Sequence, residues 1–491
     1  MLNEMSDSPS QSIEAPTNIS EPNSPVSPVN NFLTPSSITL KHFNKVRWRT
    51  LLFITILFIV SFQLRWWYIK GTTMIKPIRA DAAQYTIIAY NLVAERGAYF
   101  TDTGVGAKSE LNSRDPGYPI FLAGIIKATK PRTLEQFFYT TAWIQSILGA
   151  ITVIISYFLA RFFLPPVWSG AVSVLTMLSP HLISMTNYVL AETLFTFLLQ
   201  VALILNLFSI KKKNKSWLLA GTGFAFGLAM CVKSVLQLFP IALAAMIFFF
   251  FRHKRKNAIK YSIILLTTSF ILFAPWKIWI HFAFKGTESP SLLKATLYIG
   301  SYIGLVYDSE NQRKYGRGSP YYDDPNYDNV VNGGYGSIFG EIGKRFRENP
   351  IDYSSWYLLG KPAMFWGWTM VHGGGDINVY PNLYTWYDRN RLMNLTKKLM
   401  QLLHPLIIIL MHFGAVLFII RRANYSKTQF IMMSSILILL IYFLAIHTIL
   451  VPAPRYSIPL RPLVYFIAVL GIAELTGKPV RKKGSIDAAD Q

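Results

Sequence analysis

Three acidic residues stand where a carboxylate could do chemistry. Asp81 opens a segment whose apolar residues recur with helical spacing through Ala89 and Leu92. Asp115 lies in a short turn-forming stretch, and Glu192 precedes a long apolar run that contains no other acid. A carboxylate that is partly shielded from water can act as a general base. Each of the three is therefore a candidate catalytic residue.

Each of these acids also has a purely structural interpretation. Asp81 could cap the helix that follows by accepting amide hydrogens of its first turn. Asp115 could form only a surface pair with Arg114, before the turn sequence Pro116-Gly117-Tyr118-Pro119. Glu192 could reach water from an interface, although a carboxylate near membrane depth is costly and usually functional. The residues alone leave these alternatives open.

Four cationic residues are candidates for binding an anion such as a lipid phosphate. They are Arg114, Lys233, Lys277 and Arg455. Guanidinium and ammonium groups both bind phosphate, the former through two parallel hydrogen bonds. The alternative is that these side chains only extend to lipid headgroups. The sequence contains no phosphate loop, zinc-binding pattern or nucleophile elbow.

The elements that must position these residues are membrane helices. Of the 491 residues, 52% are hydrophobic, and they are grouped in stretches of about 20, the length that crosses a bilayer core. The net charge of +23 would suggest a nucleic-acid partner for a soluble protein. Here the charge is sorted by loop, so we expect membrane topology and no nucleic acid. The single cysteine, Cys231, excludes a disulfide within the chain.

The apolar stretches predict an all-α polytopic membrane protein with about ten transmembrane helices. The candidate spans are 51–68, 137–160, 167–184, 189–209, 217–233, 236–251, 260–281, 400–420, 429–449 and 457–475. Two large loops remain, at 69–136 and 283–399, and we expect both to carry interfacial helices, for example at 85–95 and 353–371. The stretch 308–340 is rich in Gly, Asp, Asn and Tyr, which predicts a surface loop.

Basic residues predict the orientation of the chain. They cluster in every second connection, and none of the clusters contains an acid: Arg161, Lys211-Lys212-Lys213-Asn214-Lys215, Arg252-His253-Lys254-Arg255-Lys256, Arg421-Arg422 with Lys427, and Arg481-Lys482-Lys483. The positive-inside rule places these clusters and both termini in the cytoplasm. The two large loops then lie outside, and the segments 1–40 and 477–491 become cytoplasmic tails, the first of them disordered.

The order and placement of the motifs resemble the GT-C membrane glycosyltransferases. The branch they are most similar to is the bacterial part of the protein-mannosyltransferase and aminoarabinose-transferase superfamily. The motifs are an Asp soon after the first span, the Arg114–Pro119 stretch, a Glu opening the fourth span, Pro275-Trp276 late in the seventh, and Arg455-Tyr456 followed by Pro459. The resemblance covers about residues 51–475.

The resemblance implies a fold and a set of roles. A conserved seven-span module would occupy 41–282, followed by the large outer loop at 283–399 and a three-span part at 400–476. The family's catalytic Asp would be Asp81, and Glu192 and Asp115 would match its further acids. Lys233 and Arg455 would match its phosphate-binding cations. Relatives often have an Arg where this chain has Trp279, so either Lys277 replaces that charge or the contact is absent.

These inferences lead to one functional hypothesis. We expect an inverting glycosyltransferase in the cytoplasmic (inner) membrane of a bacterium. It would move a sugar from a polyprenyl-phosphate donor to a hydroxyl of a lipid, glycan or protein acceptor at the outer face, with Asp81 as general base. No cofactor is certain, and the resemblance allows a divalent metal near Glu192. The alternatives are a transporter or flippase of lipid-linked sugars, which should show internal repeats and charged or broken helices near the midplane, and an assembly protein whose outer loops bind a partner.

Overall fold

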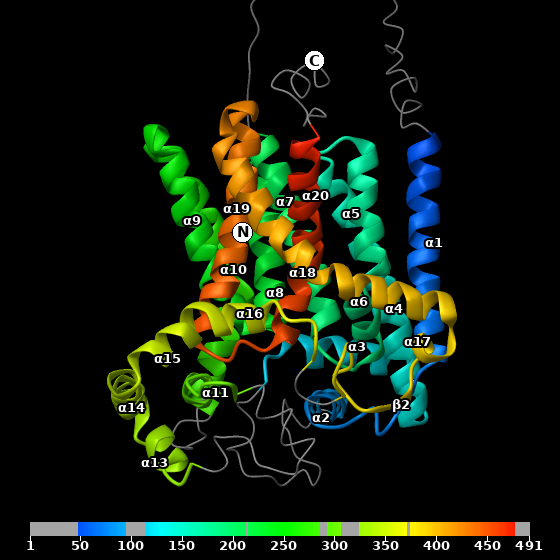
Figure 1. Cartoon of the computed structure of the whole chain (residues 1–491), viewed down its shortest axis with the longest axis vertical. Helices are drawn as coiled ribbons and strands as arrows, with labels where there is room; N and C mark the ends of the chain where they lie inside the picture. The colour runs from blue at the N-terminus through cyan, green and yellow to red at the C-terminus, as the bar shows by residue number, and fades with distance from the viewer. Residues whose placement is uncertain are drawn as a thin grey trace, which may run out of the picture. The chain divides into compact units, whose positions relative to one another are not determined.

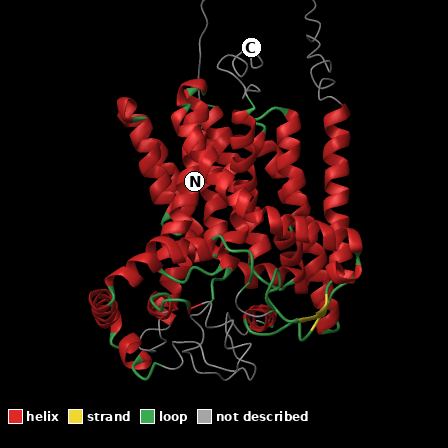
Figure 2. Ribbon diagram, in the orientation of Figure 1, coloured by secondary structure: helices red, strands yellow, loops and turns green. Residues whose placement is uncertain are grey.

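The computed structural model describes residues 48–94, 114–212, 215–283, 292–305, 324–370 and 374–476. The expected tails at 1–40 and 477–491 lie outside these residues. The chain divides into two compact units, Met1–Leu52 and Phe53–Gln491, and the first contributes only the start of helix α1 (Trp48–Lys70) to the described part. The second unit is built almost entirely of helices (Figures 1 and 2).

Within the described residues, seven helices are long and apolar enough to cross a membrane. They are α1, α4 (Leu134–Ala160), α7 (Glu192–Lys211), α10 (Arg255–Ala283), α18 (Arg391–Ile420), α19 (Lys427–Ile449), and α20 (Arg461–Leu475) continued from the 3-10 helix η8 (Pro454–Leu460). Two shorter apolar helices accompany them, α8 (Ser216–Val232) and α9 (Phe239–Phe250). The all-α polytopic class is confirmed, and the protein is an integral membrane protein.

The predicted third span is a broken helix. It consists of α5 (Pro166–Leu178), then α6 (Pro180–Ser184) with the 3-10 turn η3 (Met185–Asn187), and the two parts meet at a bend of 52°. Pro180 disfavours helical geometry at the residue before it, and Ser179 accordingly leaves the helical region at ψ 113°. With this pair as one span, the described residues contain eight long spans, so the expected ten is not confirmed as a count of full crossings.

Helix α20 forms the centre of the bundle. It is the most buried of the spanning helices and packs against α18 and α5. Gly414 of α18 and Gly471 of α20 allow the closest approach, because a Cβ built at Gly414 would lie 2.4 Å from the Ile467 carbonyl oxygen. Small residues at such crossings let two membrane helices gain van der Waals contact along their backbones.

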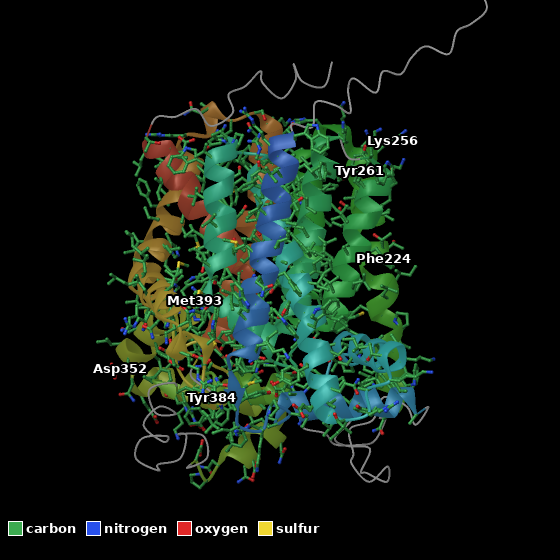
Figure 3. All side chains as sticks on the ribbon, turned by 90° about the vertical axis from the view of Figure 1, so that its right-hand side faces the viewer. Phe224, Lys256, Tyr261, Asp352, Tyr384 and Met393 are labelled. Atoms are coloured by element: carbon green, nitrogen blue, oxygen red, sulfur yellow. The ribbon has the colours of Figure 1, made fainter. Side chains whose placement is uncertain are left out.

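The two ends of the bundle differ in what they carry. At one end, which we call the basic end, α7 connects to α8, α9 to α10 and α18 to α19, and Lys256 lies there in Figure 3. At the other, the loop end, lie the helices of both large loops, with Asp352 and Tyr384 among their residues in Figure 3.

Both large loops are structured at the loop end. The first contains strand β1 (Thr73–Met74), α2 (Asp81–Val93) and α3 (Gly117–Thr129). The second contains α11 (Leu292–Ile299), α13 (Tyr327–Asn332), α14 (Gly334–Glu348), α15 (Pro350–Ser355), the π-helix η6 (Trp356–Gly360), α16 (Lys361–Phe365), strand β2 (Asn382–Tyr384) and α17 (Trp386–Arg389). Of the predicted surface loop 308–340, residues 306–323 lie outside the described part, and the prediction is wrong for α13 and the start of α14. Helix α18 begins at Arg391 rather than at 400.

A short antiparallel strand pair joins the two loops. Thr73 of β1 pairs with Tyr384 of β2, and Met74 pairs with Asn382 (Figure 2). The Trp386 backbone N–H also donates to Thr72 Oγ1 at 3.2 Å. Segments that lie about three hundred residues apart in the chain are thereby fixed against each other, directly before the helix that begins with Asp81.

Candidate active site

Asp81 is the first residue of α2, and the backbone before it is strained. Ala80 has φ 47° and ψ −124°, a combination that a residue with a Cβ rarely adopts. The N-cap position belongs to Ala80, and no side chain caps the helix, so the capping interpretation of Asp81 is wrong. A residue of the second loop contacts the first turn of α2, because the Ala82 backbone N–H donates to the Tyr380 hydroxyl at 3.3 Å.

Arg114 holds one oxygen of the Asp81 carboxylate. Its Nη2 donates to Asp81 Oδ1 at 2.6 Å, and its Nε donates to Gln84 Oε1 at 2.5 Å, one turn further along α2. The guanidinium also lies over the Tyr85 ring, 5.4 Å from its centroid. Arg114 therefore does not form the surface pair with its neighbour Asp115 that the sequence left open.

Glu192 is buried and ion-paired at the start of α7. Only 1% of its side chain is exposed, so the interpretation as an acid that reaches water is wrong. Its Oε1 accepts from Arg455 Nε at 2.5 Å and from Lys233 Nζ at 3.0 Å. Its Oε2 is buried and has no hydrogen-bond partner among the described residues.

Arg455 links the two carboxylates. While its Nε binds Glu192, its Nη1 donates to Asp81 Oδ2 at 3.0 Å. Arg455 lies on η8, Glu192 at the start of α7, and Asp81 at the start of α2. Three cations, Arg114, Lys233 and Arg455, thus surround two carboxylates at the loop end, which leaves this charge cluster with a formal excess of one positive charge.

The arginines also set the protonation of Asp81. Burial by itself would raise the pKa of this carboxyl, but the charges of Arg455 and Arg114 outweigh burial, and the pKa lies below its usual value. Asp81 is therefore ionised at neutral pH. As long as both arginines remain bound to it, it is also a weaker base than an ordinary aspartate.

Asp115 lies beside the charge cluster but bonds elsewhere. Its Oδ2 accepts from the Ser234 backbone N–H at 2.7 Å, just after the end of α8. Gly117 makes this approach possible, because a Cβ there would lie 2.7 Å from the carbonyl carbon of Cys231. Burial raises the pKa of Asp115, and the Ser234 amide and nearby Lys277 only partly oppose it.

A cavity of about 200 Å³ opens beside the charge cluster. One water needs only ~10–15 Å³ of such space, so the cavity can take a larger polar group. One part of its wall is charged, with Asp81, Arg114, Asp115, Lys233 and Arg455. The rest is mainly apolar and aromatic, and includes Phe195, Phe443, His447 and Tyr456.

Lys277 does not line this cavity among the described residues. Its ammonium lies over the Phe273 ring, 5.3 Å from the centroid. Trp279 stacks on Trp276 with ring centroids 5.0 Å apart. A role for Lys277 in phosphate binding stays a prediction, whereas Arg114, Lys233 and Arg455 meet in one place.

Several residues of the site were not found from the sequence. Gln84, Tyr85 and Tyr456 adjoin predicted site residues in the chain, so their positions carried some signal. Tyr380 and His447 carried none, because they come from the second loop and from the end of α19 and reach the site only through folding.

The charge cluster does not fit a divalent metal ion as arranged. Every oxygen of Asp81 accepts from an arginine, and Glu192 offers a single unpartnered oxygen. No group of three potential metal ligands occurs among the described residues. The carboxylates are already compensated by cations.

Comparison with known proteins identifies the fold. Residues 138–279, which include Glu192 and Lys233, match the family model of the dolichyl-phosphate-mannose-protein mannosyltransferases. The structure resembles the archaeal oligosaccharyltransferase AglB from Archaeoglobus fulgidus, solved with an inhibitory peptide and a dolichol-phosphate, with a TM-score of 0.51 and 13% identity over 87% of this chain. The chain has the GT-C fold.

The GT-C likeness has defined limits. The chain spans 50% of the length of the archaeal oligosaccharyltransferase. ArnT from Cupriavidus metallidurans, solved with undecaprenyl phosphate, aligns over 88% of this chain and 78% of its own at 12% identity, but the TM-score of 0.36 is too low to support an argument. No curated protein matches the sequence significantly. The resemblance to GT-C proteins is thus confirmed at the level of the fold.

Proposed function

We propose that this protein is an inverting glycosyltransferase that uses a sugar linked to a polyprenyl phosphate. The observation that carries the proposal is the convergence of Asp81 and three cations on one cavity of a GT-C fold, with the buried Glu192 ion-paired to two of those cations. The archaeal oligosaccharyltransferase of similar fold was solved with a dolichol-phosphate. A lipid phosphate is an anion, and the excess positive charge of the cluster is suited to one.

In the proposed reaction the acceptor hydroxyl attacks the anomeric carbon of the sugar. The bond between that carbon and the phosphate oxygen breaks, the lipid phosphate leaves with the electron pair, and Asp81 takes the acceptor proton. A single displacement inverts the anomeric configuration. Arg114, Lys233 and Arg455 stabilise the charge that develops on the leaving phosphate.

Phosphate binding would also prepare Asp81 for its role. The guanidinium groups proposed to bind phosphate are the ones that hold Asp81 in this structure. A phosphate that draws Arg114 and Arg455 toward itself weakens their hold on the carboxylate, and the pKa of Asp81 then rises. Asp81 would thus be a stronger base when the donor is bound than when the site is empty of donor.

We also propose the orientation that the basic clusters predict. Helix α2, which begins with Asp81, lies at the loop end, and the basic connections lie at the other end of the same bundle (Figure 1). With the basic end in the cytoplasm, transfer takes place at the outer face of the cytoplasmic membrane of a bacterium. An acceptor lipid, glycan or protein would approach from that side.

The test is transfer from lipid-linked sugars by purified protein in liposomes. Polyprenyl-phosphate hexoses and pentoses serve as donors, with cell-envelope extract as acceptor, and free polyprenyl phosphate is the product measured. Asp81→Asn should lower its formation at least 1,000-fold, while Asp352→Asn, at an exposed position on α15, should leave it unchanged. Transfer by Asp81→Asn at the wild-type rate would remove this mechanism.

The same assay separates the transporter alternative. A flippase would move the labelled lipid-linked sugar across the liposome bilayer without releasing polyprenyl phosphate. Movement without release by the wild-type protein would replace the transferase proposal. The broken helix α5–α6 is a feature that a transporter would share, but the charge cluster lies at helix ends rather than at this break.

A further inference from the structure

His447 lines the cavity but has no role in the proposed reaction. It lies in the last turn of α19, is 5% exposed, and lines the same cavity as Asp81 and Arg455. Its ring is held between two others: it stacks on Tyr456 of η8 with centroids 4.8 Å apart and on Phe365 of α16 with centroids 5.2 Å apart. The plane of the imidazole is therefore fixed from both sides.

The hydrogen bonds of His447 define its tautomer. Nδ1 lies 3.2 Å from the Val451 carbonyl oxygen, which can only accept, so Nδ1 carries the proton. No ion pair joins His447 to a carboxylate among the described residues, so none holds it as an imidazolium. In the neutral ring Nε2 is then an acceptor.

That acceptor is buried and unsatisfied. Nε2 of His447 has no hydrogen-bond partner in the described part of the chain. A buried polar atom without a partner lowers stability, and nearly all such atoms in folded proteins find one. His447 lines the cavity, so a ligand bound there is the nearest source of a partner once the wall adjusts around it, and that ligand has to bring a donor group.

The second loop holds His447 in place. Lys361 of α16 is fully buried and donates to the last two carbonyl oxygens of α19, those of Thr448 and Ile449, at 2.8 and 3.3 Å, and to that of the following Leu450 at 3.1 Å. Helix α16 lies against this end of α19 (Figure 1). The same short helix thus caps the turn that carries His447 and, through Phe365, supports its ring.

We propose that His447 Nε2 accepts a hydrogen bond from a hydroxyl of the transferred sugar and so helps to select that sugar. This inference rests on the proposed function. In a glycosyl polyprenyl phosphate the phosphate is a diester without a proton at neutral pH, so the lipid phosphate offers no donor to Nε2. The sugar is bonded to that phosphate and carries hydroxyl groups. The ammonium of Lys233 lies 5.3 Å from the centroid of the Tyr456 ring, on which His447 stacks. A cation proposed to bind the donor phosphate is therefore close to His447.

The test compares two replacements, each of which imitates one of the two ring nitrogens of His447. His447→Asn keeps a donor near Nδ1 but has no atom at Nε2, while His447→Gln can place its amide oxygen near Nε2. With the polyprenyl-phosphate sugar that the wild type uses, we expect kcat/KM to fall about tenfold or more in His447→Asn. In His447→Gln most of the activity should remain.

Deoxy donors then identify the contact. In the wild type, removal of one particular sugar hydroxyl should lower kcat/KM about tenfold, whereas in His447→Asn the same removal should have almost no further effect. If His447 had only a structural role, His447→Asn would lower kcat/KM by the same factor for every donor. The inference is overturned if removing each donor hydroxyl lowers kcat/KM by the same factor in the wild type and in His447→Asn. It is also overturned if the two proteins differ only in their response to a deoxy acceptor. If the wild type transfers from no lipid-linked sugar, the proposed function fails first, which is a separate result.

Discussion

Two arginines six positions apart in one segment, Arg455 and Arg461, do opposite things. Arg455 binds two carboxylates beside a cavity. Arg461 is fully buried at the start of α20 and binds only neutral groups: its Nη1 donates to His404 Nδ1 at 3.0 Å and its Nη2 to the Gly367 carbonyl oxygen at 2.8 Å. The two side chains also differ in burial, because 20% of the Arg455 side chain is exposed whereas none of Arg461 is.

The difference separates a binding site from a clamp. His404 Nε2 lies 2.7 Å from the Trp366 carbonyl oxygen and so must donate, which leaves its Nδ1 to accept from Arg461. This chain of bonds fastens residues 366–367 of the second loop to α18 and α20. Arg461 and His404 are both buried, whereas Arg455 lines a cavity in which an anion can exchange with the carboxylates. Paired charges at a cavity indicate binding, and a charge satisfied by neutral dipoles indicates structure.

Between the two arginines, the larger loss of activity is expected at Arg455. Arg455→Met should lower transfer about 100- to 1,000-fold, because the proposed phosphate and both carboxylates lose their shared cation. The thermal unfolding midpoint in detergent should change little, since Arg114 still binds Asp81 and Lys233 still binds Glu192. Near-wild-type transfer by this variant would mean that the cluster is structural.

Arg461→Met should show the reverse pattern. It leaves His404 Nδ1 and the Gly367 carbonyl oxygen without partners, at about 1–3 kcal/mol each, partly offset by removing a buried charge. We expect a clear fall in the unfolding midpoint, with the transfer rate of the protein that remains folded within about threefold of wild type. A specific loss of transfer without loss of stability would contradict the comparison.

Glu192→Gln should have an intermediate effect. The amide keeps the shape and one acceptor for Arg455 and Lys233, but it removes the charge that balances them. We expect transfer to fall about tenfold and the affinity for inorganic phosphate, measured by its inhibition of transfer, to rise. Weaker inhibition by phosphate would show that Glu192 does more than balance charge.

The smallest effect concerns the pH dependence of stability at Asp115. Because burial raises the pKa of this carboxyl, the folded protein holds a proton that the unfolded chain releases, and the free energy of unfolding falls as pH rises above about 4. Asp115→Asn keeps the acceptor for Ser234 but has no proton to lose. Its unfolding midpoint should fall less than that of the wild type over this range; equal slopes would assign the effect to another group.

The sequence by itself determined the helices and the candidate acids. Stretches of about 20 apolar residues cannot leave backbone groups unpaired in a bilayer, so they had to be helical, and α7 (Glu192–Lys211) lies within three residues of the predicted span 189–209. Asp81 and Glu192 were found because an acid beside an apolar run is costly and stands out. The broken span at Ser179-Pro180 and the helices within 327–340 were missed, since local composition there favours turns as much as short helices.

Only the tertiary structure decided which charges meet. Arg455 lies 374 residues from Asp81 in the chain, and nothing in either local sequence specifies that pairing. The strand pair between the two loops, the hydroxyl of Tyr380 and the stacking of His447 likewise depend on contacts between distant segments. Stretches of apolar residues are visible in the sequence, so the helices that they form can be predicted from it. Ion pairs and hydrogen bonds act over a few ångströms in space, so their partners depend on how the helices pack.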